Sequence, residues 1–547
     1  MNKKEISTSY QPSSVEEKWY KIWEDNNCFS PEGEKESFTI MIPPPNVTGI
    51  LHIGHILNNT IQDVLVRRAR MQGKRTLWLP GTDHASIATE AKVTQMLKKD
   101  GIDKKEIGRD EFLKHAWQWK EKYGNTILTQ LKRLGASCDW SRTTFTMDPE
   151  YSEAVTKVFV DLYNDGMIYK GERIINWDPK GQTALSDEEV IHKEISGHLW
   201  HFKYPIKDSK EHIIVATTRP ETMLGDTGIA VNPNDERYRH LIGKHVILPI
   251  VNREIPIFSD SYVDKEFGTG AVKVTPAHDP NDFDMGQRNN LDTINILNPD
   301  GSLNKNVPDL FIGKDRLGAR KLVVETLESL GLIDKIEDYV HKVGHSERTD
   351  AVVEPYISKQ WFVNMEKLVG PAIDCVKKGE VKFYPERWTK TYYHWLDNIK
   401  DWCISRQLWW GHRIPVWYKN DEIYCGITPP NEDGWVQEED VLDTWFSSWL
   451  WPFATLGWPK DSKDLQKHYP TQDLVTGPDI IFFWVARMIM AGLYFKQEIP
   501  FSNVYFNGLI RDEKGQKMSK SLGNSPDPID LMDKYGSDAL RVGLLLI

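Results

Sequence analysis

The 547-residue sequence has few of the features that mark secreted, disulfide-stabilised or membrane proteins. Its five cysteines are scattered without a CxxC pair, so neither a disulfide framework nor a zinc knuckle can be inferred from them. The polar residues 1–10 contain no apolar core of a secretion signal. The most apolar segment, residues 480–495, is interrupted by Arg487 and is predicted to be too short to span a bilayer. We therefore expect a cytoplasmic protein with no membrane partner.

The sequence also lacks an excess of basic residues, since 68 Lys and Arg stand against 79 Asp and Glu. The net charge of −11 gives no indication of a nucleic-acid partner, although one local basic patch would be enough to bind RNA. The composition, 40% hydrophobic and 27% charged, is typical of a globular protein. A chain of this length is expected to form about two to four domains.

The first part of the chain alternates between strand and helix patterns. Ser14 and Glu17 form a capping-box pattern that predicts a helix start. Residues 38–42 are predicted to form a strand that ends at three prolines, and residues 53–65 carry apolar side chains at helical spacing. Residues 76–79 are predicted to be the next strand. Strand, helix and strand in this order predict a parallel, doubly wound, Rossmann-like α/β sheet.

The pattern changes near residue 195, where short β-branched runs punctuated by Gly, Pro and Asn begin. We predict that a β-rich domain is inserted there and splits the sheet domain in two. Strands at 474–476 and 504–506 would belong to the second half. The apolar residues 538–547 stop without a helix cap, which we interpret as a truncation. The predicted domains are 1–194, 195–343 and 344–547.

The sharpest local pattern is His52-Ile53-Gly54-His55, where the first strand leads into a helix. A helix N-terminus at the end of a parallel strand attracts phosphate through unpaired N–H groups and partial positive charge. Gly54 would let the backbone approach a ligand, and both imidazoles could donate to phosphate oxygens. Taken alone, the pattern is better explained by two ordinary surface histidines.

A second pattern, Lys517-Met518-Ser519-Lys520-Ser521, follows a glycine-hinged loop. Two lysines there could neutralise charge as pyrophosphate leaves, although a solvated loop is the simpler interpretation of the segment by itself. Together, the two patterns resemble the HIGH and KMSKS motifs of class I aminoacyl-tRNA synthetases. Both occur without a departure and in the family's order.

This resemblance implies that an amino-acid carboxylate attacks the α-phosphate of ATP and that the aminoacyl group then passes to a tRNA ribose. The reaction rate would depend on the positioning of the reactants and on electrostatic stabilisation. The implied catalytic residues are His52 and His55, which hold the phosphates, and Lys517 and Lys520, which hold the leaving pyrophosphate with Mg²⁺. The implied ATP contacts are Gly54, Gly477, Asp479 and Lys520.

Within this class, the sequence resembles the valyl, isoleucyl and leucyl group, and residues 43–49, 402–412, 443–448 and 477–487 resemble the valyl form. A valine site needs a carboxylate for the ammonium, and Asp83 at the end of the second strand is placed for it. The resemblance implies further contacts from Pro44, Asn46, Trp445, Ile480 and Trp484. For each tryptophan, plain core packing is an equally good explanation. Asn507 departs from the histidine or threonine that relatives often have there.

An apolar pocket for valine cannot reject threonine, which has the same shape, and the valyl enzyme is itself the standard example of this limit. A second, hydrolytic editing site is therefore expected. Residues 217–222 and 268–282 of the insert resemble editing motifs of this group, with Asp279 binding the amino group. Without the resemblance, residues 279–282 would be interpreted as a polar turn. The implied editing residues are Thr218, Arg219, Lys273, Thr275, Asp279 and Asp282.

No structural zinc is predicted, because residues 341–354 lack cysteine, and His341 with His345 is a poor ligand set. The expected partners are ATP, L-valine and tRNA(Val), and the expected state is a monomer. An isoleucyl or leucyl enzyme, or an editing-only RNA-binding hydrolase, remains as an alternative. Since no anticodon-binding domain is encoded, we expect poor tRNA charging.

Overall fold

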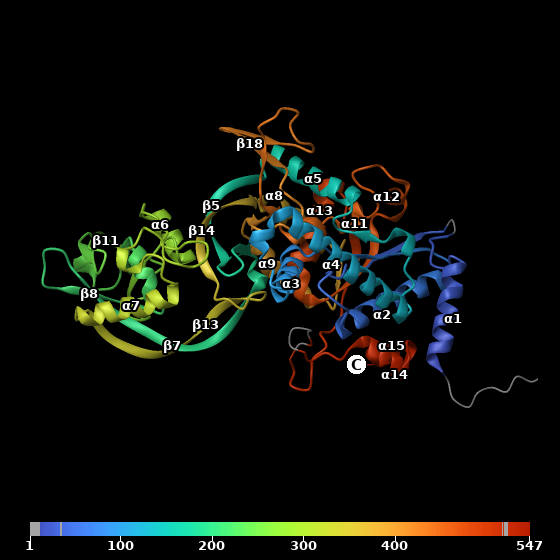
Figure 1. Cartoon of the computed structure of the whole chain (residues 1–547), viewed down its shortest axis with the longest axis horizontal. Coiled ribbons are helices and arrows are strands. Elements are labelled where there is room, and N and C mark those ends of the chain that lie inside the picture. Colours follow the sequence, from blue (N-terminus) through green and yellow to red (C-terminus); the bar gives the residue numbers. More distant parts are fainter. Residues whose placement is uncertain (1–10, 33–34, 517, 519–522, 547) are drawn as a thin grey trace, which may run out of the picture. The chain divides into compact units, whose positions relative to one another are not determined.

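The computed structural model in Figure 1 describes residues 11–32, 35–516, 518 and 523–546. The chain divides into two compact units. The first comprises Met1–Tyr169 and Phe362–Ile547, and the second comprises Lys170–Trp361. The second unit therefore begins before residue 195 and ends after residue 343, the predicted limits of the insert.

Both predicted limits fall within paired strands, β7 (Val190–Pro205) and β13 (Ile333–Ser346). Most side chains of β7 before Leu199 are exposed, whereas the alternating buried positions begin at Leu199. The apolar pattern in the sequence thus begins where burial begins, several residues after the strand itself begins.

The first unit is built on a five-stranded sheet with the strand order β15-β23-β22-β1-β2. Every neighbouring pair in this sheet is parallel, as predicted. The chain order reverses between β1 and β22, so one half of the doubly wound sheet comes from each part of the split unit. The strands are β1 (Ser37–Met41), β2 (Arg75–Leu79), β15 (Lys382–Tyr384), β22 (Thr471–Thr476) and β23 (Phe501–Phe506).

Helices cover this sheet, and the predicted helix over 53–65 is confirmed as part of α2. Shorter strands of the unit include β3 (Gly81–Thr82), β4 (Thr144–Phe145), β18 (Val416–Lys419) and β19 (Glu422–Cys425). The main helices are α1 (Pro12–Asp25), α2 (Ile53–Met71), α3 (Ser86–Lys99), α4 (Lys104–Leu134), α5 (Pro149–Asn164), α8 (Glu366–Lys377), α9 (Trp388–Asp397), α10 (Thr444–Ser448), α11 (Trp451–Ala454), α12 (Lys463–His468), α14 (Pro528–Tyr535) and α15 (Ser537–Leu545).

The capping box predicted at Ser14 and Glu17 is wrong. The N-cap of α1 is Gln11, three residues before Ser14, and Pro12 lies in the first turn. The Ser14 hydroxyl donates to the carbonyl of Gln11, so Ser14 lies inside the first turn. Proline starts a helix readily because its ring sets φ and the missing N–H would have no helical partner there.

The apolar residues 480–495 belong to a longer helical segment, Pro478–Lys496, which has 19 residues. By length and composition alone this segment could cross a membrane, which corrects the prediction that it is too short. In the described structure, 67% of its most apolar window is buried. Burial of this kind is what a core helix of a globular unit shows, so the segment is weak grounds for a membrane span.

The second unit is rich in β-structure, as predicted. A large cluster of buried apolar residues forms its main core, and a smaller cluster contains Ala230, Val263, Val274 and Met285. One sheet has the order β13-β7-β8 and another the order β10-β11-β9-β12. Its further elements are β5 (Ile168–Asp178), which starts in the first unit, β6 (Thr183–Leu185), β8 (His212–Thr217), β9 (Gly228–Val231), β10 (His245–Leu248), β11 (Arg253–Ser259), β12 (Ala271–Val274), α6 (Pro280–Arg288), α7 (Arg316–Ser329) and β14 (Glu354–Val363), which ends in the first unit.

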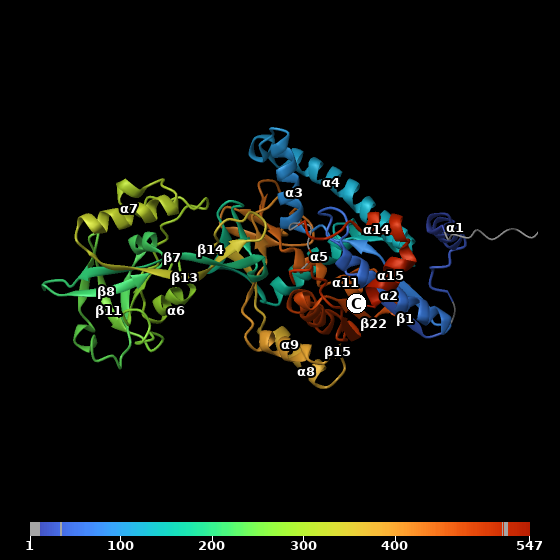
Figure 2. The same cartoon turned by 90° about the horizontal axis from the view of Figure 1, so that it is seen from below.

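A buried carboxylate joins the two helices α2 and α15, which lie side by side in Figure 2. Asp63 on α2 accepts hydrogen bonds from the backbone and hydroxyl of Ser137 and pairs with Arg67 at 2.7 Å and with Arg541 on α15. Burial raises the pKa of Asp63, but the two guanidinium groups and Ser137 outweigh this effect, and the net pKa is lowered.

Asp63→Ala should destabilise the first unit by about 3 kcal/mol at neutral pH, because it leaves buried guanidinium groups without their counter-charge. A carboxylate whose pKa is lowered on folding stabilises at high pH, and this contribution is lost as the pH falls below about 4. Urea unfolding from pH 3 to 7 should show the difference from wild type shrinking toward pH 3. Asp161→Ala, which removes a half-exposed pair with Lys157, should cost less than about 1 kcal/mol. Equal losses in both variants would contradict this account.

Candidate active site

Three loops of the first unit follow neighbouring strands and start at the same edge of the sheet. They are residues 42–52 after β1, residues 477–480 after β22, which include a short 3-10 turn, and residues 507–516 after β23. Parallel strands end at one edge, and ligands of such sheets bind where the strand order reverses. His52 ends the loop after β1 and Gly54 and His55 begin α2, whereas Gly477 and Asp479 follow β22 on the other side of the reversal.

His52 and His55 cap the start of α2 with their own rings. The His52 Nδ1 atom accepts from the Gly54 N–H at 3.1 Å, and the His55 Nδ1 atom accepts from the His52 N–H at 3.2 Å. The ring centroids are 3.8 Å apart. Because each Nδ1 atom accepts, each neutral ring carries its proton on Nε2, the atom that could donate to a phosphate oxygen.

The position of the His52 ring requires a glycine at residue 54. A Cβ atom at this position would lie 2.9 Å from His52 Cε1 and 3.0 Å from His52 Nδ1. Any side chain would therefore displace the ring that caps the helix. The glycine was predicted for close approach of a ligand, and the structure adds this local steric reason.

Asp83 follows β3, the short strand just after β2, and is bridged to the loop after β1. It forms a parallel β-bridge with Asn46, and its side chain is buried, with the residue 3% exposed. The carboxylate accepts from the Ala85 N–H at 2.7 Å and from the Ser448 hydroxyl. Among the described residues, no Lys or Arg pairs with it. Burial raises the pKa of Asp83 to about 6, against the lowering effect of the two hydrogen bonds.

The predicted amino-acid contacts differ in their surroundings. Trp484 is almost fully buried, and its Nε1–H donates to the carbonyl of Ser448 at 3.0 Å, so it packs in the core beside Asp83's partner. Trp445, on α10, is half-buried against Phe483. Pro44 and Ile480 are half-buried and Asn46 is exposed.

The predicted ATP contacts after β22 lie close to a side chain that the sequence analysis missed. A Cβ atom on Gly477 would lie 2.3 Å from Asp479 Oδ1, so the carboxylate folds back over the glycine. Asn58 on α2 donates to the carbonyl of Val475 at 3.1 Å and to the side chain of Asn507 at 2.9 Å. Asn507, the departure from the family pattern, is thus held from α2. The sequence offered one indication of a role for Asn58: it is a polar residue among the apolar positions of α2.

Lys517 and Lys520 lie outside the described residues. The loop before them, residues 507–516, is closed by Asp512, whose carboxylate accepts from the Lys514 and Gln516 N–H groups and from Asn524 at 2.8 Å. Ile510, at the start of this loop, packs against the apolar cluster that includes Leu51, Ile53 and Ile56. The base of the loop and the histidine-bearing helix start therefore share one core.

The second unit brings several predicted editing residues together around a buried aspartate that was not predicted. The Lys273 ammonium donates to Thr222, Asp226 and Thr275 at 2.9, 3.0 and 2.6 Å. Thr275 also donates to Asp226, which is fully buried. Lys273 therefore neutralises Asp226 inside the unit. The only signal for Asp226 was its place shortly after the 217–222 motif.

Asp279 and Asp282 stand next to this cluster at the start of α6. Asp279 is the N-cap and accepts from the N–H groups of Asn281 and Asp282 at 2.8 and 3.2 Å. Asp282 accepts from the Thr275 N–H at 2.8 Å, and burial together with the nearby Asp279 charge raises its pKa.

Arg219 joins the same region from the opposite loop. It donates to the carbonyl of His278 at 2.8 Å and pairs with the buried Glu354, which the sequence analysis also missed. Thr218 is half-buried beside it in the sequence. Four of the six predicted editing residues, Lys273, Thr275, Asp279 and Asp282, thus form one connected group, and Arg219 contacts the backbone immediately before Asp279.

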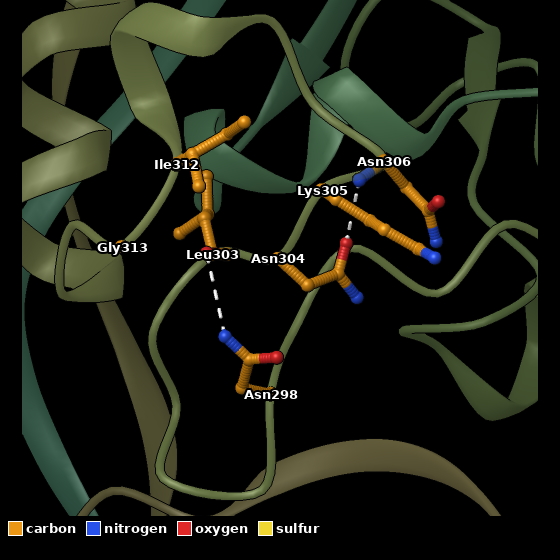
Figure 3. Close-up of a pocket in the computed structure, with 7 residues that line it drawn as sticks. All are labelled: Asn298, Leu303, Asn304, Lys305, Asn306, Ile312 and Gly313. Carbon is orange, nitrogen blue, oxygen red and sulfur yellow. Dashed lines mark hydrogen bonds between the residues drawn. The ribbon is translucent and has the colours of Figure 1, made fainter.

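A separate hollow of about 400 Å³ in the second unit contains none of the predicted residues (Figure 3). Its amide side chains shape their own loop. Asn298 donates to the carbonyl of Leu303, and Asn304 accepts from the Asn306 N–H at 2.8 Å. Within the part of the chain that the structure describes, no group of three or more His, Cys, Asp or Glu residues could hold a metal ion.

The family is shown by comparison with known sequences. The family model described as tRNA synthetases class I (I, L, M and V) matches residues 18–432 and 427–547, and the chain belongs to this family. The chain is 57% identical to Valine--tRNA ligase from Fusobacterium nucleatum and 56% identical to Valine--tRNA ligase from Clostridium tetani. Both alignments cover 99% of this chain and 62% of the relative, so the chain spans about 62% of their length.

Among solved structures, the fold is similar to that of the Agrobacterium radiobacter K84 agnB2 LeuRS in its ternary complex with tRNA and LeuAMS. The TM-score is 0.55 at 20% sequence identity, with 98% of this chain and 72% of that chain covered. This likeness concerns the fold alone.

Gly54→Ala should displace the His52 ring without unfolding the first unit, because the added methyl group meets only the end of one side chain. In ¹⁵N-histidine-labelled wild type, long-range ¹H–¹⁵N spectra should show His52 and His55 as Nε2–H tautomers. In the variant the His52 signals should move. Gly370→Ala, where a Cβ atom meets nothing within 4 Å, serves as the control. Unchanged His52 signals in Gly54→Ala would show that the ring does not depend on the glycine.

Proposed function

We propose that the chain activates L-valine with ATP to valyl-adenylate and transfers the valyl group to tRNA(Val). The observation that carries this proposal is Asp83, a buried carboxylate that pairs with no Lys or Arg among the described residues. A buried charge without a counter-charge is costly, and an ammonium group supplies what is missing. Asp83 lies at the same sheet edge as His52, and high identity to valine–tRNA ligases supports valine as the amino acid.

In the proposed first step, the valine carboxylate attacks the α-phosphate of ATP. A carboxylate–phosphorus bond forms, the α–β anhydride bond breaks, and pyrophosphate leaves with the electron pair. The Nε2–H groups of His52 and His55 would donate to phosphate oxygens, and Lys517 and Lys520 would neutralise the leaving pyrophosphate. Such groups act by fixing geometry and by stabilising charge that develops in the transition state.

In the proposed second step, a hydroxyl of the tRNA terminal ribose attacks the valyl carbonyl, an ester forms and AMP leaves. Mg²⁺ would arrive with the ATP phosphates, as it commonly does in phosphoryl-transfer sites, and we treat it as part of the substrate.

We further propose that the protein acts as a cytoplasmic monomer.

The proposed valine pocket combines Asp83 for the ammonium with apolar walls. Pro44 on the loop after β1, Ile480 in the turn after β22 and Trp445 on α10 are half-buried. Asn46 is bridged to Asp83, and Trp484 is buried in the core. Gly54, Gly477 and Asp479 are proposed to contact ATP. The alternative is an isoleucyl or leucyl enzyme, which would need a larger amino-acid pocket on the same fold.

We propose in addition that the second unit hydrolyses threonyl-tRNA(Val). Support comes from the connected group around Asp226. Lys273 donates to Thr275, and the Thr275 N–H donates to Asp282, which lies beside Asp279. Asp279 is proposed to bind the amino group of the mischarged residue. Arg219 and Thr218 are proposed to contact the tRNA end.

Valine should support ATP–pyrophosphate exchange with a kcat/KM well above that of isoleucine, leucine or threonine. Asp83→Asn should lower kcat/KM for valine roughly a hundredfold. Asparagine has the size and shape of aspartate but gives the ammonium no buried counter-charge. Asp161→Asn, on the surface of α5, should leave exchange unchanged. Faster exchange with isoleucine or leucine than with valine would overturn the amino-acid assignment.

Asp279→Ala should slow the deacylation of threonyl-tRNA(Val) at least about tenfold, since it removes the proposed anchor for the amino group. Valine-dependent exchange should not change, because the carboxylate belongs to the other unit. Asp284→Ala, on the exposed side of the same helix, is the matched control. Deacylation at the wild-type rate in Asp279→Ala would remove this residue from the editing reaction.

A further inference from the structure

We propose that Ser448 is the positioning residue that holds the Asp83 carboxylate in the orientation that receives the substrate ammonium. This inference rests on the proposed function and gives a role to Ser448, which ends the stretch 443–448 and is not among the predicted site residues. Ser448 is the last residue of α10 and is 2% exposed. It lies 365 positions along the chain from Asp83.

The Ser448 hydroxyl has one proton and two acceptors within reach. One is Asp83 Oδ2, at a short hydrogen-bond distance, and the other is the Thr444 carbonyl at 3.2 Å. A bond to an ionised acceptor is roughly twice as strong as a neutral one, so the proton goes to Asp83. The Thr444 carbonyl already accepts from the neighbouring Ser447 hydroxyl at 2.8 Å.

The backbone around Ser448 is held from three elements, so the hydroxyl has a defined position. The Trp484 indole donates to the carbonyl of Ser448 at 3.0 Å. The Tyr151 hydroxyl on α5 donates to the carbonyl of Ser447 at 2.9 Å. At the other end of α10, the Thr444 hydroxyl accepts from the Ser86 N–H at 2.9 Å. Trp484 therefore acts on the amino-acid site through the backbone of Ser448.

With one carboxylate oxygen held by Ser448 and the other by the Ala85 N–H, both oxygens of Asp83 have fixed directions. A carboxylate has about four lone-pair sites, so each oxygen keeps a further site for an ammonium proton. A carboxylate free to rotate would have to lose that freedom when the ligand binds, which weakens binding.

Two of the titratable groups that face Asp83, His84 and Tyr151, carry no charge that would lower its pKa, so the lowering comes from the two hydrogen bonds. Burial lowers the pKa of His84 well below its usual value, so this ring is neutral. Burial raises the pKa of the Tyr151 phenol well above its usual value, so it is neutral as well. The charged neighbour is Asp443, the N-cap of α10, which raises the pKa of Asp83 and itself pairs with Arg406 at 3.3 Å.

The kcat/KM for valine should depend on the ionisation of Asp83. Burial raises the pKa of Asp83 to about 6, and the ammonium requires the ionised form, so kcat/KM for valine should fall as the pH drops through about 6. The Ser448 hydrogen bond lowers this pKa. Removing it should move the acid limb of the profile to higher pH.

The test compares Ser448→Ala with Ser447→Ala in valine-dependent ATP–pyrophosphate exchange from pH 5 to 9, with calorimetric titration of valine into the same proteins. Ser448→Ala should raise the KM for valine roughly tenfold or more, change kcat less, and shift the acid limb upward. Ser447→Ala removes an equally buried hydroxyl of the same helix and should leave the limb in place. Ser448→Thr, which restores a hydroxyl, should recover much of the binding.

A wild-type KM and an unshifted acid limb in Ser448→Ala would overturn the inference, as would an equal shift in Ser447→Ala. If Ser448→Ala lowers the midpoint of thermal unfolding too far to assay, Ser448→Cys keeps the volume with a weaker donor and should show the same upward shift. Failure of the proposed function has a different signature: wild type that shows no valine-dependent exchange at any pH overturns both the function and the inference.

Discussion

The structure of the first unit depends on the parallel pairing of β1 with β22, two strands separated by more than four hundred residues. The backbone pairing between them is short, with Ile40 opposite Asp473, and side chains add further contacts. The Thr39 N–H donates to the side chain of Gln472 at 2.6 Å, and the Trp451 indole donates to the carbonyl of Ile42 at 3.0 Å. Because ligands of such sheets bind where the strand order reverses, this one pairing creates the place at which the two motif-bearing halves meet.

Buried carboxylates hold sequence-distant segments together in both units, but they are neutralised in different ways. Asp63 between α2 and α15 faces two guanidinium groups, and Asp226 in the second unit faces the Lys273 ammonium. Asp83 receives a hydroxyl and a backbone amide instead. A buried carboxylate that is already paired stabilises the fold, whereas one held only by neutral donors retains its attraction for a cation. This contrast separates the proposed binding carboxylate from the structural ones.

The departures from the sequence-based predictions have local physical causes. Helix α1 starts at Pro12 and not at the Ser14 capping pattern, because a proline in the first turn competes successfully for the helix start. The second unit extends beyond 195–343 because exposed strand residues carry no apolar pattern. The helical segment after β22, Pro478–Lys496, is longer than the apolar stretch 480–495, because residues at both ends of that stretch continue the helix.

The sequence by itself determined the alternation of strands and helices in the first unit, the β-rich character of the insert, and the identity of His52, Gly54, His55 and Asp83 as chemically suited residues. These follow from side-chain periodicity and from short motifs, which are local properties of the chain. The tertiary structure alone decided that Ser448 meets Asp83, that Asn58 meets Asn507, and that Lys273 is neutralised by Asp226. A hydrogen-bond partner that arrives through strand pairing or helix packing leaves no pattern in the local sequence, because its spacing is set by the whole fold.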